Sequence, residues 1–88
     1  MRQDIKNKAN RRLKIIEGQI RGLQTMVEDE KYCIDIITQA SAIKEALSGV
    51  EDLILENHLG THIVEQIKSG KVDQATKEIL KVYGLKRK

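Results

Sequence analysis

The sequence predicts an all-α protein that assembles from more than one chain, and three observations lead to this prediction. The 88 residues contain no proline and only two aromatic side chains. Isoleucine, leucine, valine and alanine recur at helical steps of three and four over long stretches. A chain this short buries little surface, and its single cysteine cannot form an internal disulfide. We therefore expect one helical domain over residues 1–88 that forms oligomers.

The first predicted helix carries a single apolar stripe that begins at Ile5 and ends at Val27. Its members are Ile5, Ala9, Leu13, Ile16, Ile20, Leu23 and Val27. The following segment EDEKY, residues 28–32, has no apolar period and is expected to hold the turn.

A second long helix is expected from about Cys33 onward, followed by a short third one. The apolar face of the second helix consists of Ile36, Ala40, Ile43, Leu47, Val50 and Ile54. His58 and His62 continue the same steps, and Gly70 suits the position just after a helix end. Asp73 is expected to cap the third helix, whose apolar residues are Ala75, Ile79 and Val82. Two such helical hairpins can cover their stripes by pairing into a four-helix bundle.

Charge is distributed unevenly along the chain, whose net charge is +3. Residues 1–24 carry seven basic side chains against two acidic ones, and residues 67–88 repeat that ratio. Residues 25–66 carry two basic against nine acidic side chains. Basic ends around an acidic middle indicate a polyanionic partner, although solvated helix surface has the same charge pattern.

Cys33, His58 and His62 are the only cysteine and histidines of the chain. His58 and His62 are four residues apart, which places both on one helical face within reach of one cation. Zinc-protease helices share this spacing but place a glutamate after the first histidine, where this chain has Leu59. An enzyme is therefore not predicted. Each feature alone is more often structural, as helix surface or as a small buried thiol.

Helix length makes the combination more informative. If residues 33–58 form one helix, a rise of ~1.5 Å per residue separates Cys33 from His58 by roughly 37 Å. One ion cannot bind both within a chain. If the same helix runs antiparallel beside a twofold mate, however, Cys33 of one chain meets His58 and His62 of the other. A thiolate and two imidazoles make a soft-to-borderline site for a metal ion.

The stretch RRLKIIEGQIRGLQTMVEDEKYCIDIITQASAIKEAL, followed by ENHLGTHI, resembles the CsoR/RcnR family of bacterial metal- and stress-sensing repressors. The resemblance covers nearly the whole chain. It implies three helices per chain, an antiparallel four-helix bundle dimer that pairs into a tetramer, and release of operator DNA when the inducer binds. It also implies a cross-subunit metal site.

The resemblance leaves the choice of metal open. The family's copper sensors use Cys-His-Cys, and Cys33 and His58 match the first two positions, while His62 stands at the second cysteine. Tyr32 and Glu78 match the copper branch's outer shell, although either residue can be purely structural. The nickel/cobalt branch carries a histidine at the place of His62 but also one near the N-terminus, which this chain lacks. We expect copper(I), with nickel, cobalt or zinc as alternatives.

Other inducers and other classes of function remain as alternatives. The family's persulfide sensors need two cysteines, which disfavours that reading, whereas its formaldehyde sensors use the cysteine with the N-terminal amine. A ligand-free helical structural or adaptor dimer is the alternative from a different class.

The DNA surface is expected on the first helix. Arg12 matches a basic residue that the family uses for DNA, and Lys8, Arg11, Lys14 and Arg21 can extend that surface. Without aromatic side chains there, phosphate contacts and DNA shape are expected to provide much of the affinity. No segment resembles a signal peptide or a membrane span, so we expect a cytoplasmic protein that does not bind membranes.

Overall fold

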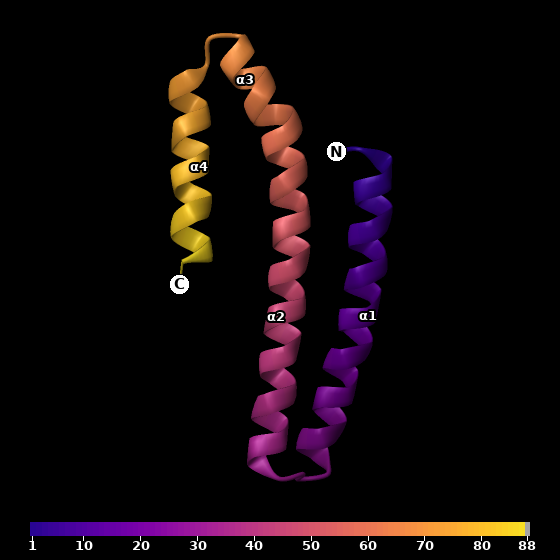
Figure 1. Ribbon diagram of the computed structural model, residues 1–88. Helices are drawn as coiled ribbons and strands as arrows, with labels where there is room; N and C mark the ends of the chain where they lie inside the picture. The colour runs from indigo at the N-terminus through magenta and orange to yellow at the C-terminus, as the bar shows by residue number, and fades with distance from the viewer. Residues whose placement is uncertain (88) are drawn as a thin grey trace. The chain divides into compact units, whose positions relative to one another are not determined.

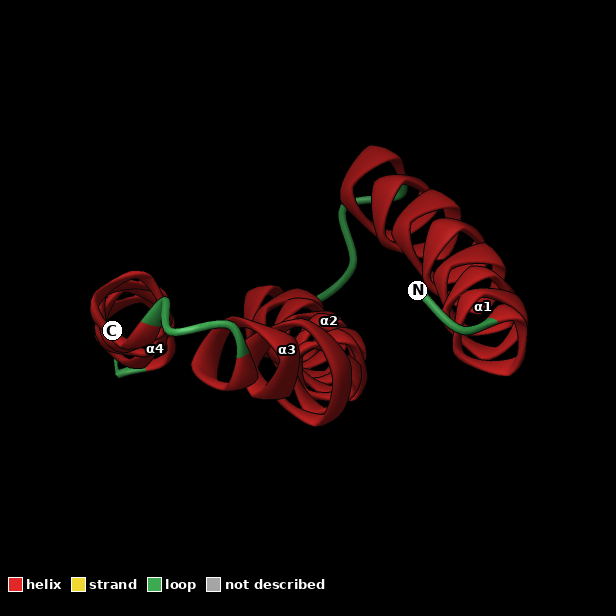
Figure 2. Ribbon diagram, turned by 90° about the horizontal axis from the view of Figure 1, so that it is seen from above, coloured by secondary structure: helices red, strands yellow, loops and turns green. Residues whose placement is uncertain are grey.

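The computed structural model describes residues 1–87, which form helices and turns and no strand (Figures 1 and 2). In Figure 2 the red helices are joined by short green connections. The predicted all-α class is thus confirmed, with three helical stretches in this range. The chain divides into two compact units, Met1–Leu55 and Glu56–Lys88. No helix among the described residues is both long enough and apolar enough to span a membrane.

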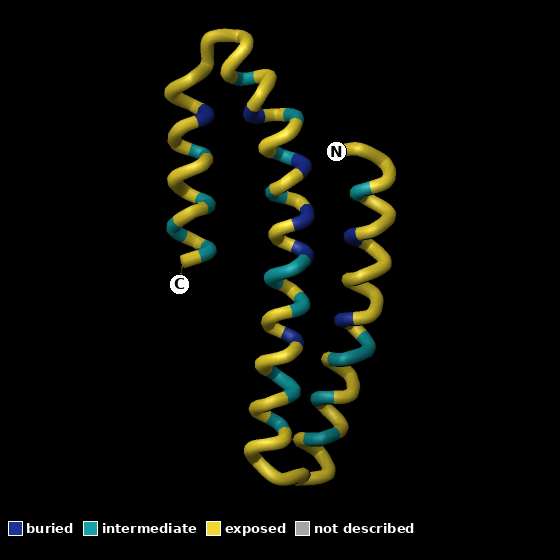
Figure 3. The backbone as a smooth tube through the Cα atoms, in the orientation of Figure 1, coloured by how far each residue is buried: buried dark blue, intermediate teal, exposed yellow. Residues whose placement is uncertain are grey.

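The first unit contains α1 (Gln3–Glu28) and most of α2 (Cys33–His58). Two residues of α1, Ala9 and Ile16, form its core with Ile43, Val50 and Leu53 of α2. Figure 3 shows these buried positions as short dark-blue segments along the two helices. The apolar periodicity therefore predicted both helices of this unit.

The buried line on each helix is narrower than the predicted stripe. On α1, Leu13, Ile20 and Val27 remain exposed although they belong to the stripe. On α2 the inner line contains Leu53, whereas the predicted Leu47 and Ile54 are exposed. The reason is that a single neighbouring helix covers only one narrow line of contact. Apolar side chains beside that line stay at the surface of the unit.

Each long helical stretch ends in the same backbone motif. After α1, the N–H of Lys31 donates to the carbonyl of Met26 at 3.0 Å, and that of Glu30 to Val27 at 3.1 Å. This pattern is a Schellman motif, in which the residue after the cap adopts a left-handed conformation. Glu30 does so with φ of 51°, although it is not glycine. The predicted turn at residues 28–32 is confirmed, with α1 ending at Glu28.

The second unit contains the end of α2, the π-helical turn η1 (Leu59–Ile63), α3 (Val64–Lys68) and α4 (Val72–Lys86). Gly70 ends α3 with φ of 83°, as its predicted position after a helix end requires. Asp73 does not cap α4, because Lys71 occupies the cap and Asp73 lies inside the first turn. Its negative charge there still favours the helix N-terminus. Of the predicted apolar residues of α4, Ala75 is buried and Ile79 is exposed.

Candidate metal centre and basic surface

Cys33 is the first residue of α2 and carries a free, exposed thiol. The residue before it, Tyr32, accepts hydrogen bonds at its carbonyl from the N–H groups of Asp35 at 3.0 Å and Ile36 at 3.2 Å. Tyr32 therefore begins the helix through its backbone, while its side chain is 72% exposed. The side chains of Tyr32 and Cys33 are therefore both exposed within the unit Met1–Leu55.

The two histidines lie against each other in the second unit. His58 is the last residue of α2, and His62 lies within η1. Their ring centroids are 5.1 Å apart, and the ring planes differ by 28°, so that the imidazoles are stacked. The prediction that this pair shares one helical face is consistent with that contact. Two adjacent imidazoles are a suitable pair of nitrogen donors for one metal ion.

Glu78 of α4 is hydrogen-bonded to His58. Its Oε2 lies 3.1 Å from Nε2 of His58 and accepts a second hydrogen bond from Nε2 of Gln66, also at 3.1 Å. The hydrogen bond with His58, followed by that with Gln66, lowers the pKa of Glu78 below its usual value of 4.5. Glu78 is thus a carboxylate at neutral pH and can only accept hydrogen bonds.

That geometry assigns roles to the two nitrogens of His58. Because an ionised Glu78 accepts, Nε2 of His58 carries the proton. In a neutral imidazole, Nδ1 then has the free lone pair that a metal ion needs. A carboxylate that fixes the tautomer and orientation of a ligating histidine in this way is typical of metal sites. The contact therefore places Glu78, predicted in the outer shell, beside His58, a predicted ligand.

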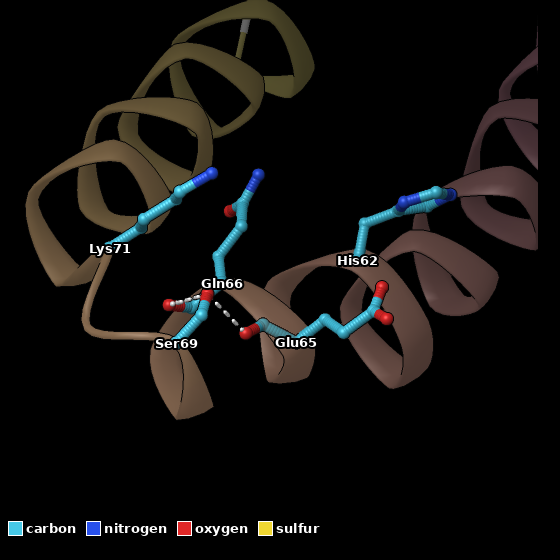
Figure 4. A pocket seen from close by; sticks show the side chains of 5 residues that line it. All are labelled: His62, Glu65, Gln66, Ser69 and Lys71. Carbon is cyan, nitrogen blue, oxygen red and sulfur yellow. Dashed lines mark hydrogen bonds between the residues drawn. The ribbon is translucent and has the colours of Figure 1, made fainter.

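A shallow pocket of about 270 Å³ lies beside the histidine pair and is shown in Figure 4. Its lining residues are His62, Glu65, Gln66, Ser69 and Lys71. The hydroxyl of Ser69 donates to the carbonyls of Glu65 at 2.9 Å and Gln66 at 3.2 Å. Sequence reasoning missed Gln66, which joins this wall to Glu78. The one sequence signal that could have indicated Gln66 is its spacing: it follows His62 by four residues, as His62 follows His58.

The three predicted metal donors are divided between the two units. Cys33 belongs to Met1–Leu55, and the two histidines belong to Glu56–Lys88. Within residues 1–87, no three His, Cys, Asp or Glu side chains are arranged to hold a metal ion. The chemistry of the donor set, one thiol and two imidazoles, nevertheless fits a soft-to-borderline cation such as copper(I).

The predicted DNA-binding side chains all lie on α1 and are exposed. They are Lys8, Arg11, Arg12, Lys14 and Arg21. In the described part of the chain no ion pair engages any of the five. Among residues 1–87, therefore, no ion pair neutralises these charges, and they can contact an external polyanion.

Comparisons with known proteins agree with the helical architecture. The chain is 45% identical over 78 residues to the copper-sensing transcriptional repressor CsoR of Bacillus subtilis. This match covers 89% of this chain and 77% of the relative. It is 42% identical over 60 residues to the copper-sensing repressor RicR of Mycobacterium tuberculosis, and this match covers 68% of this chain and 62% of the relative.

A solved structure and a family description point the same way. The structure of the copper-sensing repressor CsoR with Cu(I) from Geobacillus thermodenitrificans matches with a TM-score of 0.89 and 40% identity, covering 100% of this chain and 92% of that one. Residues 5–84 match the family described as metal-sensitive transcriptional repressors. Together with the stacked histidines and the exposed basic helix, these similarities show that the chain belongs to the family of metal-sensitive transcriptional repressors.

Proposed function

We propose that this protein is a copper(I)-responsive repressor that binds operator DNA without metal and releases it when copper(I) binds. The observation that carries the proposal is the stacked His58–His62 pair, with His58 hydrogen-bonded to Glu78, in a chain of the metal-sensitive repressor family. Similarity to proteins named as copper-sensing repressors supports the choice of metal. The family is one of transcriptional repressors, so no catalytic step is proposed.

The proposed ligands are Cys33 of one subunit and His58 and His62 of another. Cys33 begins α2 and His58 ends it, and a helix of 26 residues is too long for one ion to bridge its ends. A second copy that runs antiparallel supplies the missing thiol. Glu78 orients His58 from outside the ligand set, and Tyr32 is proposed to lie in the same outer shell.

The exposed apolar surface of the hairpin, the unit Met1–Leu55 formed by α1 and most of α2, supports assembly into dimers and tetramers. Large apolar side chains of α1 and α2 remain exposed in the unit Met1–Leu55, among them Ile15 at 59% and Ile37 at 62%. Such an amount of exposed apolar surface on a small unit is typical of a protein interface. We propose that the hairpins pair as an antiparallel four-helix bundle and that residues 1–88 act as a single domain.

Release of DNA follows from the connection between the site and α4. His58 contacts Glu78 on α4, so a change in the position of His58 on metal binding is transmitted to that helix. The assembly then favours an arrangement whose basic surfaces on α1 no longer fit the duplex. A coupling of about 1–3 kcal/mol between the two sites is typical and changes affinity about 5- to 150-fold. The proposed place of action is the cytoplasm.

The decisive experiment is an anaerobic gel-shift titration on the DNA upstream of the protein's own gene. We expect the metal-free protein to bind and Cu(I) to release it, whereas the Cys33→Ser variant binds but is not released. Ser41→Ala, an exposed change on the same helix, is the matched control. Retention of DNA by the natural protein at saturating Cu(I) would contradict the proposal.

The same titration separates the alternatives. Because two imidazoles also suit nickel, cobalt and zinc, Ni(II), Co(II) and Zn(II) form further arms, and formaldehyde forms another. Release by one of these and not by Cu(I) would assign the inducer differently within the same family. Unchanged Cu(I) affinity in His62→Cys would show that His62 is not a ligand.

A further inference from the structure

Gln66 shares one carboxylate oxygen of Glu78 with His58. Gln66 lies in α3 and Glu78 on α4, while His58 ends α2. Nε2 of Gln66 donates to Oε2 of Glu78 at 3.1 Å, and Nε2 of His58 lies 3.1 Å from the same oxygen. A single oxygen on α4 therefore contacts donors from both α2 and α3.

Glu78 needs such contacts to stay in one place. Its side chain is 36% exposed, and an exposed glutamate has several rotatable bonds and many accessible rotamers. Gln74 also forms a hydrogen bond with Glu78, but it lies one turn earlier on the same helix and cannot connect the carboxylate to another element. The bond from Gln66 joins Glu78 to α3 and restricts its carboxylate to the side that faces His58.

The orientation of the Gln66 amide leaves one of its polar atoms unpaired. Because an ionised Glu78 only accepts hydrogen bonds, the amide nitrogen of Gln66 faces it. Among residues 1–87, Oε1 of Gln66 is then buried and has no hydrogen-bond partner. A buried carbonyl without a partner destabilises a fold, and an apolar side chain at the same position avoids that cost. Stability of the fold therefore does not account for an amide at this position, whereas its contact with Glu78 does.

We propose that Gln66 is a positioning residue of the metal site, which holds the carboxylate of Glu78 against Nε2 of His58. This inference rests on the proposed function and extends the outer shell by one residue beyond Glu78. Gln66 does not contact the ion itself. It acts through Glu78, which keeps the proton on Nε2 of His58 and leaves Nδ1 free as the metal donor.

Gln66→Leu removes the amide and tests this role. Outer-shell partners of a ligating histidine typically contribute about 10- to 100-fold to affinity, and Gln66 acts one residue further out. We therefore expect Cu(I) affinity, measured in competition with a chromophoric chelator, to fall about fivefold. Gln19→Leu is the matched control, because Oε1 of Gln19 is also buried without a partner among residues 1–87, but on α1 in the other unit. An equal loss in both variants would overturn the proposal.

Gln66→Glu isolates the donor at constant side-chain size. The new carboxylate cannot donate to Glu78 at neutral pH and repels it, so the loss of Cu(I) affinity should be at least that of Gln66→Leu. Lys68→Gln makes the same change in net charge at an exposed position of α3 and should leave the affinity unchanged. Unchanged Cu(I) affinity in Gln66→Glu would show that the donated hydrogen bond has no role in the site.

A double-mutant cycle shows whether Gln66 acts through Glu78. In a Glu78→Ala background there is no carboxylate to hold, so adding Gln66→Leu should change Cu(I) affinity by less than about twofold. A merely structural role of Gln66 predicts the same about fivefold loss in both backgrounds, because residues that act independently have additive effects. That additive result would contradict the proposal even if each single variant lost affinity.

A measurement without metal separates this inference from the proposed function. In the metal-free natural protein, NMR cross-relaxation between the ring protons of His58 and the side chain of Glu78 should report their contact. The signal should weaken in Gln66→Leu and persist in Gln19→Leu. If the natural protein fails to bind Cu(I) while this difference appears, the copper assignment is wrong and the positioning of Glu78 by Gln66 stands. If the signal is the same in all three proteins, the positioning role is wrong.

Discussion

Glu78 makes the residue-scale contact that matters most for the proposed site. Its carboxylate accepts from both His58 and Gln66, and each contact measures 3.1 Å. The sequence separates these residues by 20 and 12 positions, yet they meet because α4 returns beside the end of α2 within the second unit. The orientation of one ligand therefore depends on a separate helix.

Replacement of Glu78 by alanine is expected to weaken Cu(I) binding by about tenfold, because His58 loses the acceptor that fixes its tautomer. Glu78→Gln should lie between the alanine variant and the natural protein, since a carboxamide oxygen still accepts from His58. Cu(I) competition titrations measure both. Asp73→Asn changes the other acidic residue of α4 and should have no effect. An equal loss in Asp73→Asn would mean that charge on α4, and not the contact, is responsible.

At the scale of elements, the two helix ends with Schellman motifs differ in one residue type. Gly70 adopts its φ of 83° without steric cost, whereas Glu30 carries a Cβ at φ of 51°. A left-handed conformation costs a residue with a Cβ roughly 1–2 kcal/mol. The turn before Cys33 is consequently the more strained of the two.

Glu30→Gly is therefore expected to raise the free energy of unfolding by about 1 kcal/mol, and Gly70→Ala to lower it by a similar amount. Thermal or urea unfolding followed by circular dichroism measures both changes. Glu30→Ala, which removes the carboxylate but keeps a Cβ, is the control and should not stabilise. Equal stabilisation by the alanine and glycine variants would attribute the effect to charge.

η1 is the element that differs most from the sequence-based expectation. The apolar steps from Ile36 to Ile54 continue through His58 and His62, so the sequence predicts a single α-helix that ends just before Gly70. The structure instead has a π turn at Leu59–Ile63, between α2 and α3. Apolar periodicity cannot detect such a turn, because one wider turn hardly changes which residues share a face.

At the scale of the whole molecule, the exposed apolar surface of the hairpin predicts self-association. Ile37→Glu should reduce the mass of the assembly in sedimentation equilibrium, because a charge at an apolar interface is costly to desolvate. Ile37 is 62% exposed within its own unit, so the hairpin itself should remain helical by circular dichroism. Asn10→Glu introduces the same charge at an exposed polar position of α1 and should leave the mass unchanged. An unchanged mass in Ile37→Glu would place the interface elsewhere.

The basic surface of α1 predicts DNA binding that weakens steeply with salt. Arg12→Ala is expected to reduce the slope of log affinity against log salt by about one for each copy whose Arg12 contacts phosphate. Lys44→Ala removes an equal charge from the acidic middle of the sequence and serves as control. Fluorescence anisotropy across a salt series measures the slope. Equal changes in the two variants would mean that net charge alone governs binding.

The sequence by itself determined the helices, the turn at residues 28–32, the glycine at the end of α3 and the spacing of Cys33, His58 and His62. These features depend on local periodicity and on backbone preferences of single residue types, which can be read along the chain. The tertiary structure decided that Leu53 is buried and Leu47 is not, that Glu78 meets both His58 and Gln66, and that His62 stacks on His58. These outcomes depend on which segments pack together and on small energy differences between hydrogen-bonding patterns, so they emerge only when the helices are placed in space.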